Sequence, residues 1–543
     1  MRFRQLSVLA LALLAGQSMA ENVSLRMSVS AGRTGPVFSA QQAEVGSFGL
    51  TPTLPAHANG ARWWVVATDS HGVVLHKTAV QNVLQRRVES FDPRTGSIDY
   101  AGQVTLEQGV FEVSMPFDKN VARIEVRSDA EAGQLAPAAD AALAANPGAA
   151  VLGQFERAAL QKVIDGAARS KAQSLAAKAT ATTIIETGPA NARMDYVFVG
   201  DGYTAAEMDK WHLDAKKVID GFMADPLFAA NRANMNVRRV DVASNQSGAD
   251  EPDRGIYRDT AMDGSFYCAS IARLLCVNSA KVLNIVGSVL APDARDVIVV
   301  VSNSTRYGGS GGDVAALSMA PQSIEIALHE IGHTAFYLAD EYTYGSCDTR
   351  SEPAAGNVSL RGSRSVKWGS LISANTAVPT PLGTYANGTV GAFIGGDYCA
   401  SGKYRPTENS RMRTLGYPWH AVNEGLARAV FARYGSGTSS GNVVTRNGSL
   451  NSGQSVNTPA ASPGYVTTTG SGKFTVGLTG PAGADFDLFL YKWNGSTWAA
   501  VASSTGSGPN ETISYDGSAG SYYVKVSALS GSGNYTLSYS FPK

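Results

Sequence analysis

The segment ALHEIGHTAFYLADEY, residues 327–342, carries two histidines four positions apart, His329 and His333, and this spacing constrains both its fold and its chemistry. Residues four apart share one face of an α-helix, so a helical segment lets both imidazoles bind one metal ion. Glu330 lies beside them, where a carboxylate can polarise a water that attacks a peptide carbonyl. The alternative is a buried helix with two incidental histidines, a rare outcome in a chain with 7 histidines among 543 residues. Apolar residues at helical spacing predict a packed side, formed by Ile324, Leu328, Ile331, Ala335 and Leu338.

A zinc site that supports catalysis needs a third protein ligand and an open position for water. The nearest downstream candidates are Asp340 and, as the alternative, Glu341. On an unbroken helix, Asp340 would lie about 10 Å beyond His333 along the axis, because each residue adds about 1.5 Å. The helix must therefore end or bend soon after His333 if either carboxylate is to reach the ion.

The first twenty residues, MRFRQLSVLALALLAGQSMA, combine two arginines, an apolar run and a small-residue ending at Ala20. This three-part pattern predicts a secretory signal that is removed after Ala20. The alternative, a membrane anchor, needs a longer apolar run than these residues provide. We therefore expect a secreted protein without membrane insertion, located in the medium or the periplasm.

Charge balance excludes some partners. Lys and Arg together number 45, as do Asp and Glu, so the formal net charge is zero. Such a chain offers no general attraction for nucleic acid or for an anionic membrane surface. Charged residues are 17% of the chain while glycines number 57, a composition that suits secreted β-rich modules.

The four cysteines are expected to form disulfides, because export places them in an oxidising environment. We predict the pairs Cys268–Cys276 and Cys347–Cys399 among the three pairings that four cysteines allow. No cysteine precedes residue 192, so a thiol from the preceding segment cannot cap the metal.

Composition and pattern divide this long chain into several parts. Alternating apolar and polar residues between turn-forming breaks predict a β-sandwich at each end. An Ala-rich stretch predicts a helical connector or pro-segment that shields the next domain, where helix and strand patterns mix. The predicted parts are a signal peptide at 1–20, an N-terminal β-sandwich at 21–127, the connector at 128–191, a mixed α/β zinc peptidase domain at 192–434, a linker at 435–443 and a C-terminal β-sandwich at 444–543.

Within the central part, Thr204 and Glu207 form the sequence pattern of a capping box, which predicts a helix that begins there. The Gly-rich stretch at 308–319 precedes the histidine segment and is expected to supply an edge strand with which a substrate peptide pairs. Asp201 is interpreted as a structural carboxylate in a turn. His212 and His420 are expected outside the metal site, although His420 is a weak substitute ligand.

Several segments together resemble one family. HEIGHTAFYLADEY, VFVGDGYTAAEMDKW, DVIVVVSNSTRYGGSGG and YRPTENSRMRTLGYPW are similar to the IgA-peptidase-like metallopeptidases, or igalysins, of the metzincin clan, over roughly residues 192–432. The resemblance implies a metzincin-type zinc peptidase fold with His329 and His333 as ligands and Glu330 as general base. It also implies Asp340 as the third ligand. Where related peptidases place a turn-forming glycine, this chain has Phe336.

The same resemblance places Met412 in a turn beneath the metal. Tyr417 or Tyr342 is a candidate donor to the oxyanion of the tetrahedral intermediate.

The last hundred residues resemble the bacterial pre-peptidase C-terminal domain. Such domains accompany secreted peptidases, and the resemblance implies binding of calcium, glycan or insoluble substrate. Asp485 and Asp487 share one face of an expected strand and are candidate calcium ligands, although a solvated surface is the simpler interpretation.

The sequence thus predicts a secreted zinc-dependent endopeptidase that acts on a protein or peptide substrate through metal-activated water, with Glu330 as general base. The alternative is a secreted binding or adhesive protein with a structural or vestigial zinc site. A purely structural zinc would have four protein ligands and no need for Glu330. The sequence does not define the natural substrate, and the family's name is not used to assign one.

Overall fold

The computed structural model describes most of the chain. It covers residues 21–46, 48–50, 62–128, 150–173, 179–312, 314–345, 347–435, 444–459, 464–468, 472–481 and 483–541. The predicted signal peptide lies outside these residues, as do residues 129–149 of the connector and residues 436–443 of the linker. None of the described helices combines the length and apolar character needed to cross a membrane.

Two N-terminal sheets share one core. One sheet has the order β2-β1-β7 and the other the order β4-β3-β8-β9, and side chains such as Val23, Leu25, Val65 and Ile124 are buried between them. Their strands alternate buried and exposed residues because successive side chains point to opposite faces. The strands are β1 (Asn22–Gly32), β2 (Gly35–Gly46), β3 (Arg62–Thr68), β4 (Val74–Gln81), β7 (Gln108–Pro116), β8 (Arg123–Ser128) and β9 (Val151–Glu156).

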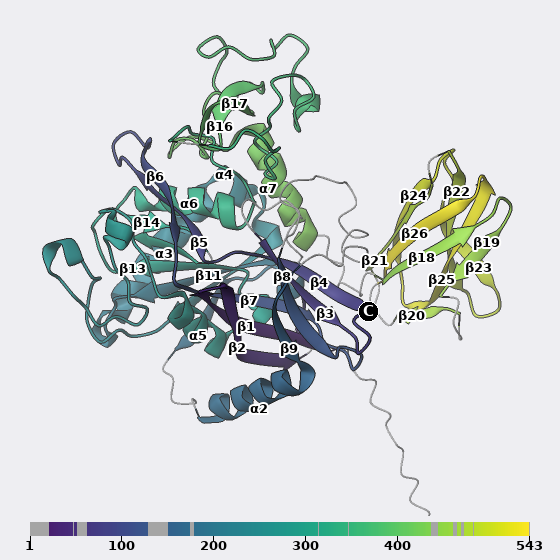
Figure 1. The fold of residues 1–543 in the computed structure, drawn as a ribbon, viewed down its shortest axis with the longest axis horizontal. Coiled ribbons are helices and arrows are strands. Elements are labelled where there is room, and N and C mark those ends of the chain that lie inside the picture. Colours follow the sequence, from purple (N-terminus) through teal and green to yellow (C-terminus); the bar gives the residue numbers. More distant parts are fainter. Residues whose placement is uncertain are drawn as a thin grey trace, which may run out of the picture.

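A separate two-stranded hairpin leaves these sheets. Its strands are β5 (Gln85–Phe91) and β6 (Ile98–Thr105), paired antiparallel. Figure 1 shows this hairpin extending from the N-terminal sheets over the central domain, beside α6 (Ser323–Thr334) and β14 (Gly309–Ser310). We call residues 85–105 the crossing hairpin.

The central domain contains a six-stranded mixed sheet in the order β10-β12-β11-β13-β15-β14. Four inner strands run parallel, while the edge strands β10 and β14 run antiparallel to their neighbours. The inner strands β11 and β13 are buried along their whole length, as expected for parallel strands covered on both faces. The remaining bounds are β10 (Thr180–Ile185), β11 (Met194–Asp201), β12 (Met235–Asp241), β13 (Val297–Ser302) and β15 (Ala315–Ser318).

Helices cover both faces of this sheet. Tyr196 and Phe198 of β11 pack in the same core as α3 (Met208–Ala224), α6 and α7 (His420–Gly435). Val197 and Val199 point the other way, toward α5 (Ser279–Val289). The predicted capping box is confirmed: Thr204 N–H donates to Glu207 at 3.0 Å, and a 3₁₀ turn leads directly into α3.

The described part of the connector is distributed over both domains. β9 pairs with β8 in an N-terminal sheet, α2 (Arg157–Gln173) packs beside β2, and β10 pairs with β12 in the central sheet. These elements do not cover the histidine helix. The segment that covers it is the crossing hairpin.

The C-terminal residues form two further sheets, in the orders β18-β26-β21-β24 and β19-β25-β22-β23, with β20 beside β25. Figure 1 shows them as a distinct body in green and yellow. Their strands are β18 (Val444–Leu450), β19 (Ser455–Thr458), β20 (Val466–Thr468), β21 (Gly472–Thr479), β22 (Asp485–Trp493), β23 (Trp498–Ser504), β24 (Asn510–Gly517), β25 (Gly520–Ser530) and β26 (Gly533–Ser540). The chain is therefore strand-rich and multidomain, with sheets at both ends and a mixed sheet between them.

Both predicted disulfides form. Cys268 pairs with Cys276, and Cys347 pairs with Cys399 at the start of β17 (Cys399–Arg405), which itself pairs with β16 (Phe393–Gly396). The second disulfide fixes the loop after the histidine helix to this short hairpin.

Candidate metal centre

The histidine helix ends soon after His333, as it must if Asp340 is to reach the two histidines. α6 stops at Thr334, and Tyr337 adopts a left-handed conformation with φ of 57°. Tyr337 N–H donates to His333 O at 3.2 Å, and Leu338 N–H donates to Gly332 O at 2.9 Å, so the chain turns back on the helix. This turn brings Asp340 to the face that carries the histidines.

Phe336, which replaces the expected glycine, takes no part in the left-handed step. Its ring is buried among the rings of Phe228, Trp419 and Phe431, at centroid distances of 6.1, 5.9 and 5.4 Å. The turn occurs one residue later, at Tyr337. A left-handed conformation costs a non-glycine residue such as Tyr337 about 1–2 kcal/mol of conformational free energy. The packing of Phe336 in the core therefore stabilises this turn.

Three candidate ligand atoms converge. The Nε2 atoms of His329 and His333 are 3.1 Å apart, and Asp340 Oδ1 lies 3.3 Å from the first and 3.1 Å from the second. Atoms bound tetrahedrally at about 2.0–2.1 Å from one ion must lie roughly 3.3 Å from one another. The donor spacing and the donor types therefore fit a zinc-sized ion.

The other ring nitrogens fix the tautomers. His329 Nδ1 lies 2.9 Å from Arg411 O, and His333 Nδ1 lies 2.7 Å from Leu338 O. A carbonyl can only accept, so each Nδ1 donates, and loss of the Nε2 proton would turn a lone pair toward the cluster. Backbone carbonyls that orient histidine ligands in this way are the usual outer support of a metal site.

The charges of the cluster favour a cation. Asp340 is fully buried, and neither of its carboxylate oxygens accepts a hydrogen bond. Burial opposes its ionisation, but the neighbouring His333 and His329 hold the pKa of Asp340 well below its usual range. Burial likewise disfavours charge on His333, yet the Asp340 carboxylate raises the pKa of His333 to about 9. The site therefore stabilises positive charge among largely buried side chains.

Glu330 lies beside the cluster, at the helical position directly after His329. It is 7% exposed, and burial, with a contribution from the charge of Glu89, raises the pKa of its carboxyl group to about 7. A Cβ on Gly311 would lie 1.9 Å from Glu330 Oε2, so glycine is needed there to admit the carboxylate at the edge of the sheet. A carboxyl group with a pKa near 7 is suited to accept and return a proton.

Comparison with known proteins shows two matches to protein families. Residues 182–386 match the IgA peptidase M64 family. Residues 465–528 match the bacterial pre-peptidase C-terminal domain. M64 peptidases are metallopeptidases, so the family agrees with the chemistry of the cluster, and all three candidate ligands lie inside the matched residues. The chain therefore contains a stretch similar to the M64 peptidases, followed by one similar to the bacterial pre-peptidase C-terminal domain.

Similarity to solved structures is low. The pre-peptidase C-terminal domain of a collagenase from Bacillus anthracis is 18% identical, over 18% of this chain and 88% of that chain, with a TM-score of 0.16. The mitogen derived from Yersinia pseudotuberculosis is also 18% identical, over 18% and 85%, with a TM-score of 0.16. The lipase BlEst2 of Bacillus licheniformis in its propeptide form is 10% identical, over 67% and 78%, with a TM-score of 0.14. At these scores the superpositions carry no conclusion about this chain.

Met412, which the resemblance places in a turn beneath the metal, packs against the histidine helix. A Cβ on Gly332 would meet Met412 Sδ at 2.5 Å, so this methionine packs directly against the histidine helix. The residue before it supplies the carbonyl that supports His329, and Glu341 N–H donates to Met412 O at 2.7 Å. These contacts link the turn, the helix and the residue after Asp340.

The structure does not bring Glu341 into the cluster. Its carboxylate is buried and accepts hydrogen bonds from Asn357, Ser410 and Asn423 at 3.0, 2.6 and 2.9 Å. Asp340 alone of the two candidates faces the histidines. Glu341 instead ties two loops and helix α7 together behind the site.

The remaining predicted residues lie elsewhere. Tyr417 is 38% exposed, whereas Tyr342 is buried, with its hydroxyl 3.3 Å from that of Tyr398. His212 lies near Asp241, and His420 lies 3.4 Å from an asparagine, so both are outside the cluster.

Asp201 is a structural carboxylate, as predicted. It accepts hydrogen bonds from Met262 N, Thr260 Oγ1 and Gly264 N at 2.8–2.9 Å. It therefore holds a loop and takes no part in the cluster.

Calcium binding at the C-terminal domain gains no support. In the part of the chain that the structure describes, the cluster at the histidine helix is the one place where three or more His, Cys, Asp or Glu side chains could hold a metal. Asp485 and Asp487 form no such group, and their assignment as calcium ligands stays a prediction.

Two residues at the site were missed. Glu89, on the crossing hairpin, completes a group of four with His329, His333 and Asp340, whose ligand atoms all lie within 4.8 Å of one another. Tyr398 donates its hydroxyl to Glu89 Oε1 at 3.4 Å. The available signal was the strand QRRVESF itself, which carries three charged residues in seven although it lies among apolar strands.

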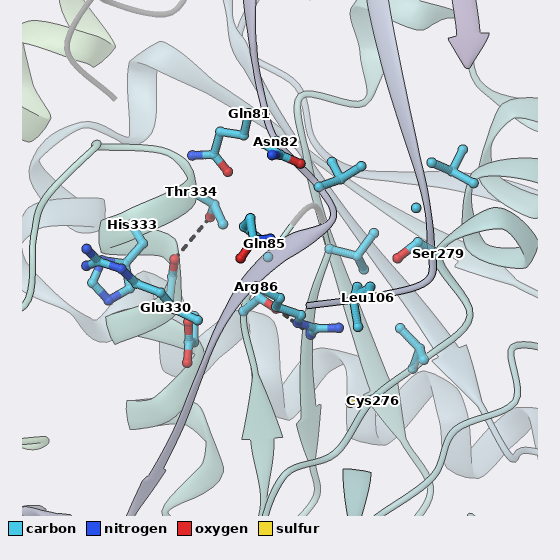
Figure 2. Close-up of a pocket in the computed structure, with 18 of the residues that line it drawn as sticks. Gln81, Asn82, Gln85, Arg86, Leu106, Cys276, Ser279, Glu330, His333 and Thr334 are labelled. Atoms are coloured by element: carbon cyan, nitrogen blue, oxygen red, sulfur yellow. Dashed lines mark hydrogen bonds between the residues drawn. The ribbon is translucent and has the colours of Figure 1, made fainter. Parts of the chain in front are cut away.

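A pocket of about 520 Å³ runs beside the cluster. Figure 2 shows Glu330 and His333 on one side of it, while a strand of the N-terminal domain that carries Gln85 and Arg86 crosses in front. Cys276 and Ser279 line the opposite side. The N-terminal and central domains thus form this pocket together.

Proposed function

We propose that this chain is a secreted zinc-dependent endopeptidase in which His329, His333 and Asp340 hold the metal. The observation that carries the proposal is the convergence of these three ligand atoms at 3.1–3.3 Å, with Glu330 buried beside them. Two imidazoles and one carboxylate are a set that catalytic zinc sites use. The M64 match supports a peptidase, and the C-terminal match supports export.

Each group has one task. Bound zinc would supply Lewis-acid polarisation of the attacking water and of the scissile carbonyl. Glu330 would accept the proton of the attacking water and pass it to the leaving amine. His329 and His333 are held by backbone carbonyls, so no rearrangement of either ring is needed during the reaction.

A substrate peptide has a natural place to bind. β14 is the antiparallel edge of the central sheet, and Gly311 follows it next to Glu330. A peptide that adds to this edge as a further strand would present a backbone carbonyl to the cluster. Backbone pairing would bind protein substrates whatever their sequence. Any preference for particular substrate side chains would come from the adjoining pocket.

Tyr398 is the tyrosine best placed to stabilise the oxyanion, in place of Tyr417. Its hydroxyl already donates to a carboxylate oxygen at the cluster, that of Glu89. An oxyanion at the same position would accept the same hydrogen bond.

Replacement of Tyr398 by phenylalanine is expected to lower kcat by roughly 100-fold, the lower part of the range seen when an oxyanion donor is removed. KM should change little, because the hydrogen bond is stronger to the oxyanion than to the substrate carbonyl. Steady-state cleavage of a fluorogenic peptide measures both constants, with all variants made in the Glu89→Ala background. Tyr417→Phe is the matched control and should keep the parental kcat. Equal kcat values for Tyr398→Phe and its parent would remove Tyr398 from this role.

A second candidate function is a secreted binding protein with a structural zinc. The four-residue cluster favours it, since a structural zinc has four protein ligands. Against it stands Glu330, a buried carboxyl group that a structural site does not need, with a glycine opposite to admit it.

Metal removal separates the two candidates. We expect the Glu89→Ala variant of the mature chain, from which the fourth side chain of the cluster is removed, to cleave a reduced and alkylated protein, to lose all cleavage after chelation, and to regain it with about one equivalent of zinc per chain. A structural zinc predicts instead that chelation unfolds the domain and that zinc-loaded protein cleaves nothing. Mass spectrometry of the products, with circular dichroism of the same samples, distinguishes these results. Cleavage that persists without metal would contradict the proposal.

A further inference from the structure

We propose that Glu89 is a fourth metal ligand supplied by the crossing hairpin, and that the chain is a latent precursor until this hairpin is displaced. This inference rests on the proposed function of the site. A catalytic zinc keeps one position open for water, and a glutamate in that position prevents hydrolysis. The hairpin also lies along the edge where a substrate would bind.

Glu89 is built into the site. Its side chain is 4% exposed, its Oε2 lies 3.2 Å from His329 Nε2, and its Oε1 accepts the hydroxyl of Tyr398 at 3.4 Å. The distance to His329 matches the spacing of the other three ligand atoms. A carboxylate buried this deeply needs a cationic partner, and a metal ion shared with His329 and Asp340 provides one.

Strand β5 presents three side chains to the site with a period of two. Arg87 lies 3.6 Å from Asp340 Oδ2 and 3.3 Å from Asp397 Oδ1, and its guanidinium stacks 5.0 Å from the Tyr398 ring. Glu89 reaches the ligand cluster. Phe91 is 1% exposed, and its ring centroid lies 5.0 Å from that of His329. The inward face of the strand thus covers the site.

Arg86 holds the strand at the edge of the central sheet. Its Nη2 donates to Ser310 Oγ at 3.1 Å and to Gly311 O at 2.5 Å. Ser310 belongs to β14, and Gly311 is the residue that faces Glu330. A substrate strand that pairs with this edge would have to displace Arg86.

The far end of the crossing hairpin is also fixed. Leu415 N–H donates to Gly96 O at 2.8 Å, and Ser97 forms an antiparallel bridge with Thr414. These two partners follow Met412, which packs beneath the histidine helix. The hairpin therefore spans the site from the sheet edge to the segment below the helix.

The body of the N-terminal domain is docked independently. Arg26 on β1 donates to Leu283 O on α5 at 2.8 Å and pairs with Glu112 at 2.7 Å. Glu112 in turn pairs with Arg295 of the central domain at 3.2 Å. With contacts at α5 and at the cleft, the N-terminal domain fixes the position of Glu89.

The test uses the mature chain, residues 21–543, with cobalt(II) in place of zinc and acetohydroxamate as a probe that binds an open metal position. If the hairpin is closed in 99 of 100 molecules, the apparent affinity for the probe falls about 100-fold. We therefore expect Glu89→Ala to bind acetohydroxamate roughly 10- to 100-fold more tightly than the parent. The cobalt absorption bands should also differ between the two proteins before the probe is added, because water replaces a carboxylate.

Two further variants complete the comparison. Glu107→Gln changes an exposed glutamate of the same domain and should behave as the parent. Glu89→Gln keeps the size of the side chain but replaces the anionic ligand, and should lie between the parent and Glu89→Ala. It keeps the test decisive if Glu89→Ala fails to fold.

The outcomes separate this inference from the proposed function. If parent and Glu89 variants bind cobalt, show the same bands and take up acetohydroxamate equally, Glu89 is not a ligand and the latency proposal is wrong, while the peptidase proposal stands. If no variant binds cobalt at the cluster, both proposals are wrong. Tighter probe binding and faster cleavage by Glu89→Ala and Glu89→Gln would support both.

Discussion

Glu330→Gln is expected to abolish peptide cleavage and to leave metal binding intact. Glutamine keeps the size and the position of the side chain, but it cannot accept the proton of the attacking water. General-base catalysis contributes roughly 10²- to 10⁴-fold, so we expect kcat to fall by about that factor. Cleavage of a fluorogenic peptide should be measured in the Glu89→Ala background, in which the fourth metal position is open.

The matched control for this substitution is Glu424→Gln. Glu424 lies on α7 and pairs with Arg428 at 3.3 Å on the surface. An exposed pair of this kind contributes little to stability, so the control should keep parental activity. A similar loss of kcat in both variants would mean that the assay reports protein quality and not the role of Glu330.

Asp340→Asn is expected to weaken zinc binding by more than about 100-fold, which exceeds the loss caused by removing an outer-shell partner. The substitution removes the one anionic ligand that the central domain contributes and introduces an amide that can point its N–H groups at the ion. Competition with a zinc-chelating dye measures the change in affinity. The effect should be larger in the Glu89→Ala background, because only two histidines then remain.

Glu341→Gln tests the alternative third ligand in the same assay. Glu341 accepts three hydrogen bonds behind the site, so its replacement should lower stability by about 1–3 kcal/mol without changing zinc affinity. If Glu341→Gln weakens zinc binding and Asp340→Asn does not, the assignment of Asp340 is wrong.

Local patterns in the sequence predicted local structure correctly. The spacing of His329 and His333 predicted that both imidazoles lie on one face of a helix, and the pair Thr204 and Glu207 predicted a helix start. Both depend on residues within one turn of a helix, where chain geometry fixes which side chains meet. Both predicted disulfides form, one between cysteines 8 positions apart and the other between cysteines 52 positions apart.

The turn that delivers Asp340 was harder to predict. A glycine is the usual signal for a left-handed residue, and this chain has Phe336 at the expected place. The structure uses Tyr337 instead, stabilised by the burial of Phe336 in the core. Tertiary packing thus replaces a local preference, and such packing is not visible in a short window of sequence.

Glu89 could not be placed from the sequence, because it precedes His329 by 240 residues and belongs to another domain. The alternating pattern predicted a β-sandwich over residues 21–127, but not that one strand leaves these sheets and lies across the pocket beside the histidine helix. The pro-segment hypothesis was assigned to the Ala-rich connector, whose described elements lie elsewhere. Contacts between domains depend on how whole surfaces fit together. A short stretch of one sequence therefore gives little indication of them.

The central claim is that the metal cluster and the carboxylate of Glu330 act together in peptide hydrolysis. Metal content and cleavage rate, measured on the same samples of Glu89→Ala and of Glu89→Ala with Glu330→Gln, test it most directly. We predict one zinc per chain in both proteins, with cleavage by the first and none by the second. Undiminished cleavage by the zinc-loaded double variant would contradict the account, as would a zinc-loaded Glu89→Ala protein that cleaves no peptide bond.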